Sequence, residues 1–180
     1  VKTHFDIIAT DYDKWKKKNS YYYNTLKSFV KKVIRPKSKV LEIGCATGEI
    51  LNCCDSFTGV GIDISPEMIE IAKKKFPQLT FKCSPIESLE YPDTFDYIIM
   101  VDVIDHVYDV MDVFNSIYKF CHPNTKIILS TINPWWGPVL SFLEKIKQKM
   151  PEGPHNFIEK RNLKNIVEYL DFTVSISEYL

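Results

Sequence analysis

The sequence has no long apolar segment and no excess of charge of either sign. Its longest apolar run is about five residues, around Ile98–Val101, whereas a membrane-spanning helix needs roughly 20. Residues 1–6 do not contain the apolar core of a secretory signal. With 45 % hydrophobic and 26 % charged residues, the composition excludes a disordered chain. We therefore expect one globular domain of 180 residues without a membrane span.

Cysteines are few, and their spacing does not pair them. There are five, an odd number, and none forms a Cys-x-x-Cys pair: Cys45, Cys53, Cys54, Cys83 and Cys121. This pattern is typical of free thiols in a reducing compartment rather than of a disulfide framework or a zinc site. It predicts a cytoplasmic protein.

The zero net charge conceals an uneven distribution. Residues 1–40 carry eleven Lys or Arg and three Asp or Glu, so the rest of the chain is correspondingly acidic. A basic segment attracts phosphate or nucleic acid, but it is equally the solvated face of a helix. We expect residues 1–36 to form a helical arm or lid, and residues 37–180 to form the ligand-binding domain.

Short apolar runs alternate with helical patterns along the chain. Strands are expected at Lys39–Ile43, Phe57–Ile62, Leu79–Cys83, Phe95–Val101, Lys126–Thr131 and Phe172–Ser177. Helices are expected within 6–34, 65–76, 105–120, 139–149 and 161–170. Strands that are nearly continuously apolar and alternate with helices indicate an α/β fold with a doubly wound, mostly parallel sheet covered on both faces.

Two features follow consecutive strands of this predicted sheet. A turn with Gly44 and Gly48 follows the first strand, and Asp63 ends the second, 19 positions beyond Gly44. Glycines let a ligand approach the backbone, and a carboxylate at this place accepts hydrogen bonds from a ribose diol. Glu42, just before the turn, would repel a pyrophosphate and suits a cationic, amino-bearing ligand. The pair therefore favours a nucleoside cofactor without phosphates over NAD.

These residues resemble the class I S-adenosylmethionine-dependent methyltransferases, which have a Rossmann-like fold. Glu-x-Gly-x-x-x-Gly at 42–48 is similar to the first motif of that family, and Gly61–Ser65 to its second strand. Phe95–Ile99, followed by Asp105-His106-Val107, is similar to its fourth-strand segment. Tyr12-Asp13-x-Trp15 resembles an element of many small-molecule members. The likeness spans roughly residues 5–180, and Ala46 stands where many members have glycine.

The resemblance implies S-adenosylmethionine as the cofactor and assigns residues to its parts. Gly44, Cys45 and Ala46, in the turn that ends at Gly48, pass under the methionine part, which Val101, Asp102 and His106 flank. Tyr12 reaches the methionine carboxylate. Asp63 binds the ribose hydroxyls, Ile64 packs on adenine, and Ser84, Pro85 and Ile86 lie at the adenine edge.

The family usually ends its sheet with a hairpin of two strands, and only one of them is expected here, at Phe172–Ser177. The last hairpin strand is thus missing from the prediction, which would leave a sheet edge exposed. Either a second subunit, as in a homodimer, or the continuation of a longer chain is expected to cover that edge.

The acceptor side of the site is less well defined by the sequence. His106 and His155 are candidates for the catalytic base, although His106 is equally a packing residue beside the cofactor. Trp135 and Trp136 begin the irregular segment 133–160, a candidate substrate cap in which they offer a stacking surface or a hydrophobic plug.

A metal is not expected. Carboxylates with one histidine recur at helical spacing and would share a helix face, where they suit a divalent metal or, more commonly, simply face solvent. These residues are Asp102, Asp105, His106, Asp109 and Asp112.

The sequence thus predicts methyl transfer from S-adenosylmethionine to a small-molecule acceptor by in-line displacement. Two alternatives remain open. The basic first forty residues allow an RNA methyltransferase. The incomplete sheet edge allows a non-catalytic, cofactor-binding partner subunit.

Overall fold

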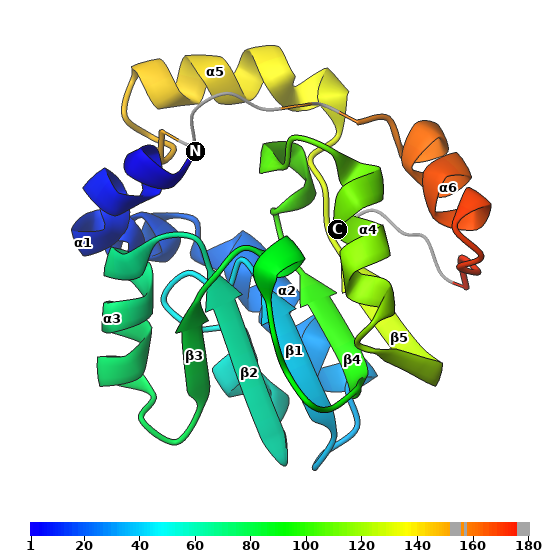
Figure 1. The fold of residues 1–180 in the computed structure, drawn as a ribbon. Helices are drawn as coiled ribbons and strands as arrows, with labels where there is room; N and C mark the ends of the chain where they lie inside the picture. The colour runs from blue at the N-terminus through cyan, green and yellow to red at the C-terminus, as the bar shows by residue number, and fades with distance from the viewer. Residues whose placement is uncertain (152–155, 157, 176–180) are drawn as a thin grey trace.

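The described residues form a five-stranded parallel sheet with the order β3-β2-β1-β4-β5 (Figure 1). The computed structural model describes residues 1–151, 156 and 158–175. The strands are β1 (Lys39–Ile43), β2 (Thr58–Asp63), β3 (Thr80–Cys83), β4 (Phe95–Met100) and β5 (Cys121–Leu129). The parallel, doubly wound sheet predicted from the apolar runs is confirmed.

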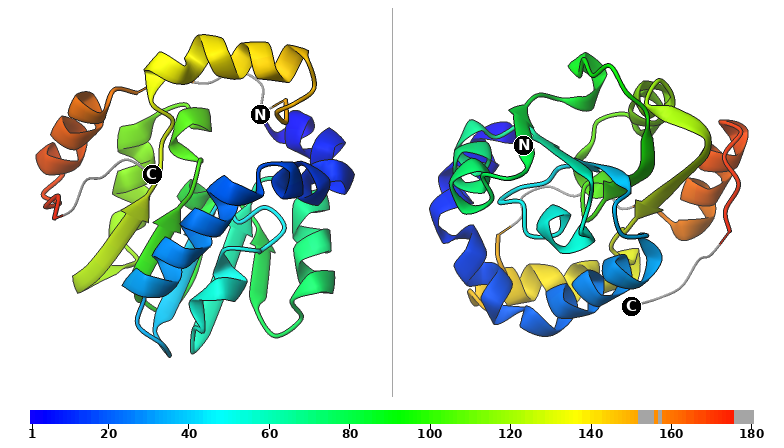
Figure 2. Two further views of the ribbon diagram at one scale, coloured as in Figure 1. Left: turned by 180° about the vertical axis from the view of Figure 1, so that it is seen from behind. Right: turned by 90° about the horizontal axis from the view of Figure 1, so that it is seen from below.

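Helices cover both faces of the sheet and the carboxyl ends of its strands (Figure 2). They are α1 (Lys2–Lys18), α2 (Ser20–Val33), α3 (Pro66–Lys75), α4 (Val110–Tyr118), α5 (Gly137–Lys145) and α6 (Lys160–Tyr169). Short 3-10 turns are η1 (Leu51–Cys54), η2 (Ile86–Ser88), η3 (Ile104–His106) and η4 (Pro134–Trp136). Figure 1 shows α1 and α5 beyond the carboxyl ends of the strands.

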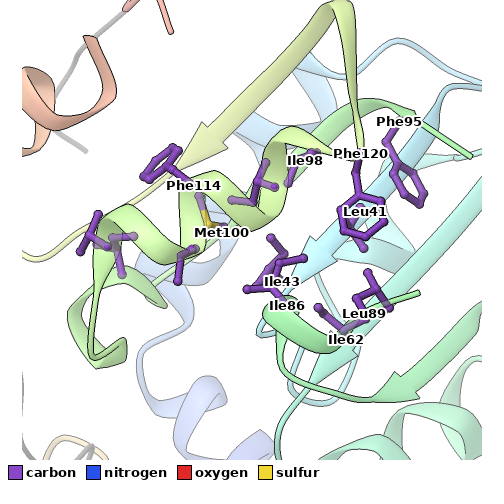
Figure 3. Close-up of a cluster of buried hydrophobic side chains, with 14 of the residues drawn as sticks. Leu41, Ile43, Ile62, Ile86, Leu89, Phe95, Ile98, Met100, Phe114 and Phe120 are labelled. Carbon is purple, nitrogen blue, oxygen red and sulfur yellow. The ribbon is translucent and has the colours of Figure 1, made fainter. Parts of the chain in front are cut away.

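Alternation along the strands divides the core between the two faces. Leu41 and Ile98 pack with Phe114 of α4 and Val167 of α6, as the close-up of this cluster shows for the sheet and α4 (Figure 3). A side chain one position along a strand points to the opposite face. Val40 accordingly packs with the helices on the other side.

On that second face, α2 and α3 complete the core. Val30 of α2 and Ile69 of α3 are almost fully buried with Val40 and Ile99. The start of α3 follows from its sequence, because the Ser65 side chain accepts the backbone N–H of Met68 and Pro66 occupies the first helical turn.

One predicted helix is shorter than expected, and one predicted strand is absent from the described residues. The helix expected over 105–120 begins only at Val110, because the Asp109 side chain caps it by accepting the N–H groups of Met111 and Asp112. Residues 172–175 form no strand, and the remainder of the predicted strand lies outside the described residues. Phe172 instead packs its ring against Phe114 and Tyr118, at centroid distances of 5.6 and 5.9 Å.

Within the described residues, no helix combines the length and the apolar character that crossing a bilayer requires.

Candidate functional site

A cavity of about 260 Å³ opens at the carboxyl ends of β1, β2 and β4. In a doubly wound sheet, this is where the strand order reverses and where ligands bind. The cavity contains nearly all residues that the sequence assigned to a cofactor: Tyr12, Glu42, Gly44, Cys45, Ala46, Asp63, Ile64, Ser84, Pro85, Ile86, Val101, Asp102 and His106. The exception is Gly48, which does not line it.

The turn after β1 requires glycine at position 44. Gly44 has φ +69°, and a Cβ atom there would lie 2.3 Å from Cγ2 of Val103. Ala46 also has a positive φ, +44°, a region that costs an L-residue roughly 1–2 kcal/mol. The predicted glycine turn is therefore present, and its tight conformation exposes backbone to the cavity.

Asp63 joins this turn to the end of β2. Its Oδ2 accepts the N–H of Ala46 and its Oδ1 accepts the N–H of Ser65, both at 2.9 Å. Burial raises the pKa of Asp63, the backbone hydrogen bonds oppose this, and the nearby Asp6 raises it further. The two bonds fix the rotamer, and the carboxylate keeps lone pairs for a ligand hydroxyl.

Glu42 is a second carboxylate of the cavity wall and only 2 % exposed. Its Oε2 accepts the N–H of Leu51 at 2.9 Å. Burial raises its pKa to about 8, although Lys16 of α1 and the Leu51 bond lower it. A cationic group bound beside this buried acid would lower its pKa again and stabilise the carboxylate.

Asp102 is held in a left-handed turn after β4, with φ +55°. Its Oδ1 accepts the hydroxyls of Tyr22 and Ser130, each at 2.7 Å, and its N–H donates to Ser130 at 3.0 Å. These two positioning residues were missed by sequence reasoning. Ser130 follows β5 and could have been found by its strand-end position, whereas nothing marked Tyr22.

One group of the residues that line the cavity is aromatic and apolar. The rings of Phe5 and His106 meet edge to face, with centroids 5.3 Å apart. Val107, Tyr108 and Met150 also line the cavity. His106 thus lies at the cavity, as predicted, beside an aromatic residue of α1.

Asp105 fixes the turn η3 that carries His106. It is 1 % exposed, and it accepts the Thr131 hydroxyl at 2.7 Å and the Ile132 N–H at 3.1 Å. Asp109 caps α4, as described above. The helix face expected to join these carboxylates with Asp102 is therefore absent, and no metal-binding group of three or more side chains exists among the described residues.

Helix α1 forms one wall of the cavity. The side chains of Val1, Phe5, Tyr12 and Lys16, which lie on one face at helical spacing, line it. His4 donates to the carbonyl of Pro151 at 2.7 Å, and Lys18 to that of Lys147 at 3.5 Å. The arm and part of the 133–160 segment therefore enclose the cavity together.

The predicted acceptor residues of that segment do not reach the cavity. Trp135 and Trp136 are 89 % and 57 % exposed and are not among the residues that line it. His155 lies outside the described residues. Among the described residues of this segment, Met150, which sequence reasoning missed, lines the cavity.

The fold and the cavity define a Rossmann-like, class I methyltransferase. The chain belongs to the methyltransferase domain family, whose model matches residues 15–175. Proteins of this family use S-adenosylmethionine as their cofactor. The predicted family, fold and cofactor are thus confirmed.

Named relatives are similar to this chain over most of its length. A ubiquinone biosynthesis O-methyltransferase from Bartonella tribocorum is 30 % identical over 152 residues, 76 % of this chain. Phosphoethanolamine N-methyltransferase 1 from Arabidopsis thaliana is 33 % identical over 136 residues, 69 % of this chain and 28 % of that enzyme. The chain spans 60 % of the Bartonella enzyme and 64 % of its fission yeast counterpart from Schizosaccharomyces pombe.

Solved structures show the same fold. A methyltransferase from Thermotoga maritima, described as a possible histamine N-methyltransferase, superposes with a TM-score of 0.79 at 20 % identity, covering 96 % of this chain and 81 % of that one. Magnesium protoporphyrin IX methyltransferase from Synechocystis, with bound S-adenosylhomocysteine, gives 0.74 at 20 % identity and covers 98 % and 89 %.

Proposed function

We propose that this chain transfers the methyl group of S-adenosylmethionine to a small-molecule acceptor by in-line displacement. One observation carries the proposal: the Asp63 carboxylate is bonded to the Ala46 N–H of the glycine turn, and both line one cavity. The turn and the carboxylate are therefore one preformed unit. A carboxylate acceptor beside an open backbone turn fits a cofactor with a ribose diol and an amino acid end.

The proposed roles follow the places of the residues in the cavity. Asp63 accepts the ribose hydroxyls, and the turn from Gly44 to Ala46 lies under the methionine part. Asp102 faces that part from the end of β4, and Tyr12 faces it from α1. The adenine ring lies against Ile64 and the segment Ser84, Pro85 and Ile86, and Val101 completes the wall.

When bound, S-adenosylmethionine supplies a methyl group on a positively charged sulfur, so no further activation of the leaving group is required. The protein orients the acceptor and excludes water. Holding the reacting atoms at roughly 3–3.5 Å supplies about 7–11 kcal/mol of such a barrier. We propose His106 as the group that receives a proton from the acceptor, because it lines the cavity.

The acceptor is proposed to have an apolar or aromatic body. The supporting observation is the cavity lining, to which Phe5, Val107, Tyr108 and Met150 contribute together with His106. An RNA acceptor is less favoured by the arrangement of the basic arm. There, Lys16 lines the cavity and Lys14 pairs with Asp11 at 2.6 Å.

For the whole protein, we infer a cytoplasmic location and a second copy as partner. All five cysteines are free thiols, which is typical of a reducing compartment. In the sheet of the described residues, β5 is an edge strand. A strand from a second copy would satisfy its outer hydrogen-bonding groups.

The function is tested by thermal melts and by label transfer. S-adenosylmethionine at 100 times its dissociation constant should raise the free energy of unfolding by about 2.7 kcal/mol, whereas NAD should leave it unchanged. With methyl-labelled cofactor and a cell extract, label should enter acid-soluble small molecules. A melt that responds to NAD alone, or label that enters only RNA, would contradict the proposal.

A further inference from the structure

The Lys16 ammonium is placed in the cavity between two aromatic rings. Its Nζ lies 4.6 Å from the ring centroid of Tyr12 and 4.7 Å from that of Tyr23. A cation over an aromatic face is attracted by the ring quadrupole. Lys16 is therefore oriented by α1 and α2 and contributes to the cavity wall together with Glu42 and Asp102.

No carboxylate of residues 1–151 and 158–175 pairs with this ammonium. Among the described residues, none lies within the 4.0 Å of an ion pair, although Glu42, Asp102, Asp13 and Glu49 all raise the pKa of Lys16. Burial has the larger effect and lowers that pKa. Within the described part of the chain, the positive charge is thus enclosed without a direct counter-ion.

Lys75 of α3, in contrast, forms ion pairs with two of the carboxylates that act on Lys16. It pairs with Asp13 at 2.7 Å and with Glu49 at 2.6 Å. Those two carboxylates are therefore engaged by α3. Of the four that act on Lys16, the remaining two, Glu42 and Asp102, line the cavity with it.

The cavity thus has a cation on the α1 wall and two acidic side chains, Asp102 at the end of β4 and Glu42 at the end of β1. A bound ammonium beside Glu42 would lower its raised pKa and favour its ionised form. This charge pattern is complementary to a zwitterion that carries its ammonium and its carboxylate on one carbon. We propose that Lys16 binds the α-carboxylate of the cofactor's methionine part, while Glu42 and Asp102 face its α-ammonium. This assignment rests on the proposed function. It makes Lys16 a second residue of α1, beside Tyr12 one helical turn earlier, that faces the methionine part.

A purely structural role for Lys16, in which it only clamps α1 to α2 through the two tyrosines, makes a different prediction. A clamp would support the whole cavity, so its loss would weaken every ligand that binds there. A carboxylate-binding residue acts only on ligands that have the carboxylate. Ligands that lack it therefore separate the two roles.

The experiment is calorimetric titration of Lys16→Met with three ligands. S-adenosylhomocysteine has the complete amino acid, decarboxylated S-adenosylhomocysteine has only the ammonium, and 5′-methylthioadenosine has neither. Loss of a charge-assisted hydrogen bond should weaken S-adenosylhomocysteine about ten- to a hundredfold. The affinity of 5′-methylthioadenosine should change less than about twofold, and the decarboxylated ligand should bind as well or better, because a repelling cation is gone.

Lys17→Met is the matched control, because Lys17 is the neighbouring, exposed lysine of α1. It should leave all three affinities unchanged, and Lys16→Arg should retain most of the affinity for S-adenosylhomocysteine. A second measurement needs no variant: in the wild-type protein, the NMR signal of the Lys16 ammonium should shift with S-adenosylhomocysteine and not with 5′-methylthioadenosine.

The outcomes distinguish the assignment from the proposed function. Unchanged affinity of Lys16→Met for S-adenosylhomocysteine, or equal weakening of all three ligands, would overturn the role of Lys16 and leave the cofactor site intact. A wild-type protein that binds none of the three ligands would overturn the proposed function itself.

Discussion

The Tyr22 hydroxyl donates a 2.7 Å hydrogen bond to Oδ1 of Asp102 and so links α2 to the turn after β4. The two residues are 80 positions apart in the chain. Burial, followed by the charge of Asp102, raises the pKa of the tyrosine far above its usual value. Tyr22 therefore stays a neutral donor, and it holds a carboxylate whose own backbone is in the left-handed region.

Tyr22→Phe should test this link. Removing the hydroxyl leaves Asp102 with Ser130 as its side-chain donor, and hydrogen bonds to charged groups contribute about 1.5–3 kcal/mol. We expect the free energy of unfolding, measured with urea, to decrease by an amount within that range. We also expect S-adenosylhomocysteine to bind severalfold more weakly. Tyr21→Phe, which changes an adjacent exposed tyrosine, should alter neither quantity. Equal behaviour of the two variants would show that the link contributes nothing.

Two substitutions in the glycine turn should act in opposite directions. Gly44→Ala adds a Cβ 2.3 Å from Val103 at φ +69°, and strain plus overpacking should cost about 2–4 kcal/mol. Ala46→Gly relieves the positive φ at Ala46 but adds freedom to the unfolded chain, so a net gain of up to about 1 kcal/mol is expected. Urea unfolding of both variants measures the pair. A stabilised Gly44→Ala protein would contradict the described turn.

The ribose role of Asp63 predicts a loss of cofactor affinity. Asp63→Ala removes a charged acceptor, and we expect S-adenosylhomocysteine to bind about ten- to a hundredfold more weakly by calorimetry. Asp93→Ala is the control, since Asp93 is half-exposed, precedes β4 at the opposite end of the sheet and pairs with Lys39. If Asp63→Ala bound the ligand as the wild type does, the ribose would have to lie elsewhere.

Much of this architecture could be predicted from local sequence. Buried parallel strands are apolar throughout, and a glycine turn or a carboxylate at their ends is visible in sequence, so Gly44 and Asp63 were found. Lys16 was missed because it lies in a run of lysines, which usually face solvent. Only the packing of α1 against α3 and α2, beside the cavity, shows that this lysine points inward while Lys17 does not.

The errors arose where distant contacts override a local pattern. The alternation from Phe172 onward is typical of a strand, but the ring of Phe172 packs on α4 instead. Asp109 occurs within a helical pattern, yet its side chain caps a new helix. Tyr22 reaches Asp102 across the fold, and no local rule connects two residues so far apart.

Burial of Glu42 predicts a pH-dependent contribution to stability. Its pKa is about 8 in the folded protein, against an ordinary value of 4.5. Between these values the folded state binds more protons than the unfolded state, so the free energy of unfolding decreases as pH rises. The stabilisation from this group is complete below pH 4.5 and is lost as pH rises through about 8.

Glu42→Gln isolates this contribution, because glutamine has nearly the shape of the protonated acid and does not titrate. The free energy of unfolding of the variant, relative to the wild type, should increase steadily from pH 5 to pH 8 in urea titrations. Glu67→Gln, in the exposed first turn of α3, should run parallel to the wild type. Parallel curves for Glu42→Gln and the wild type would mean that Glu42 is ionised throughout, with Lys16 outweighing the cost of its burial.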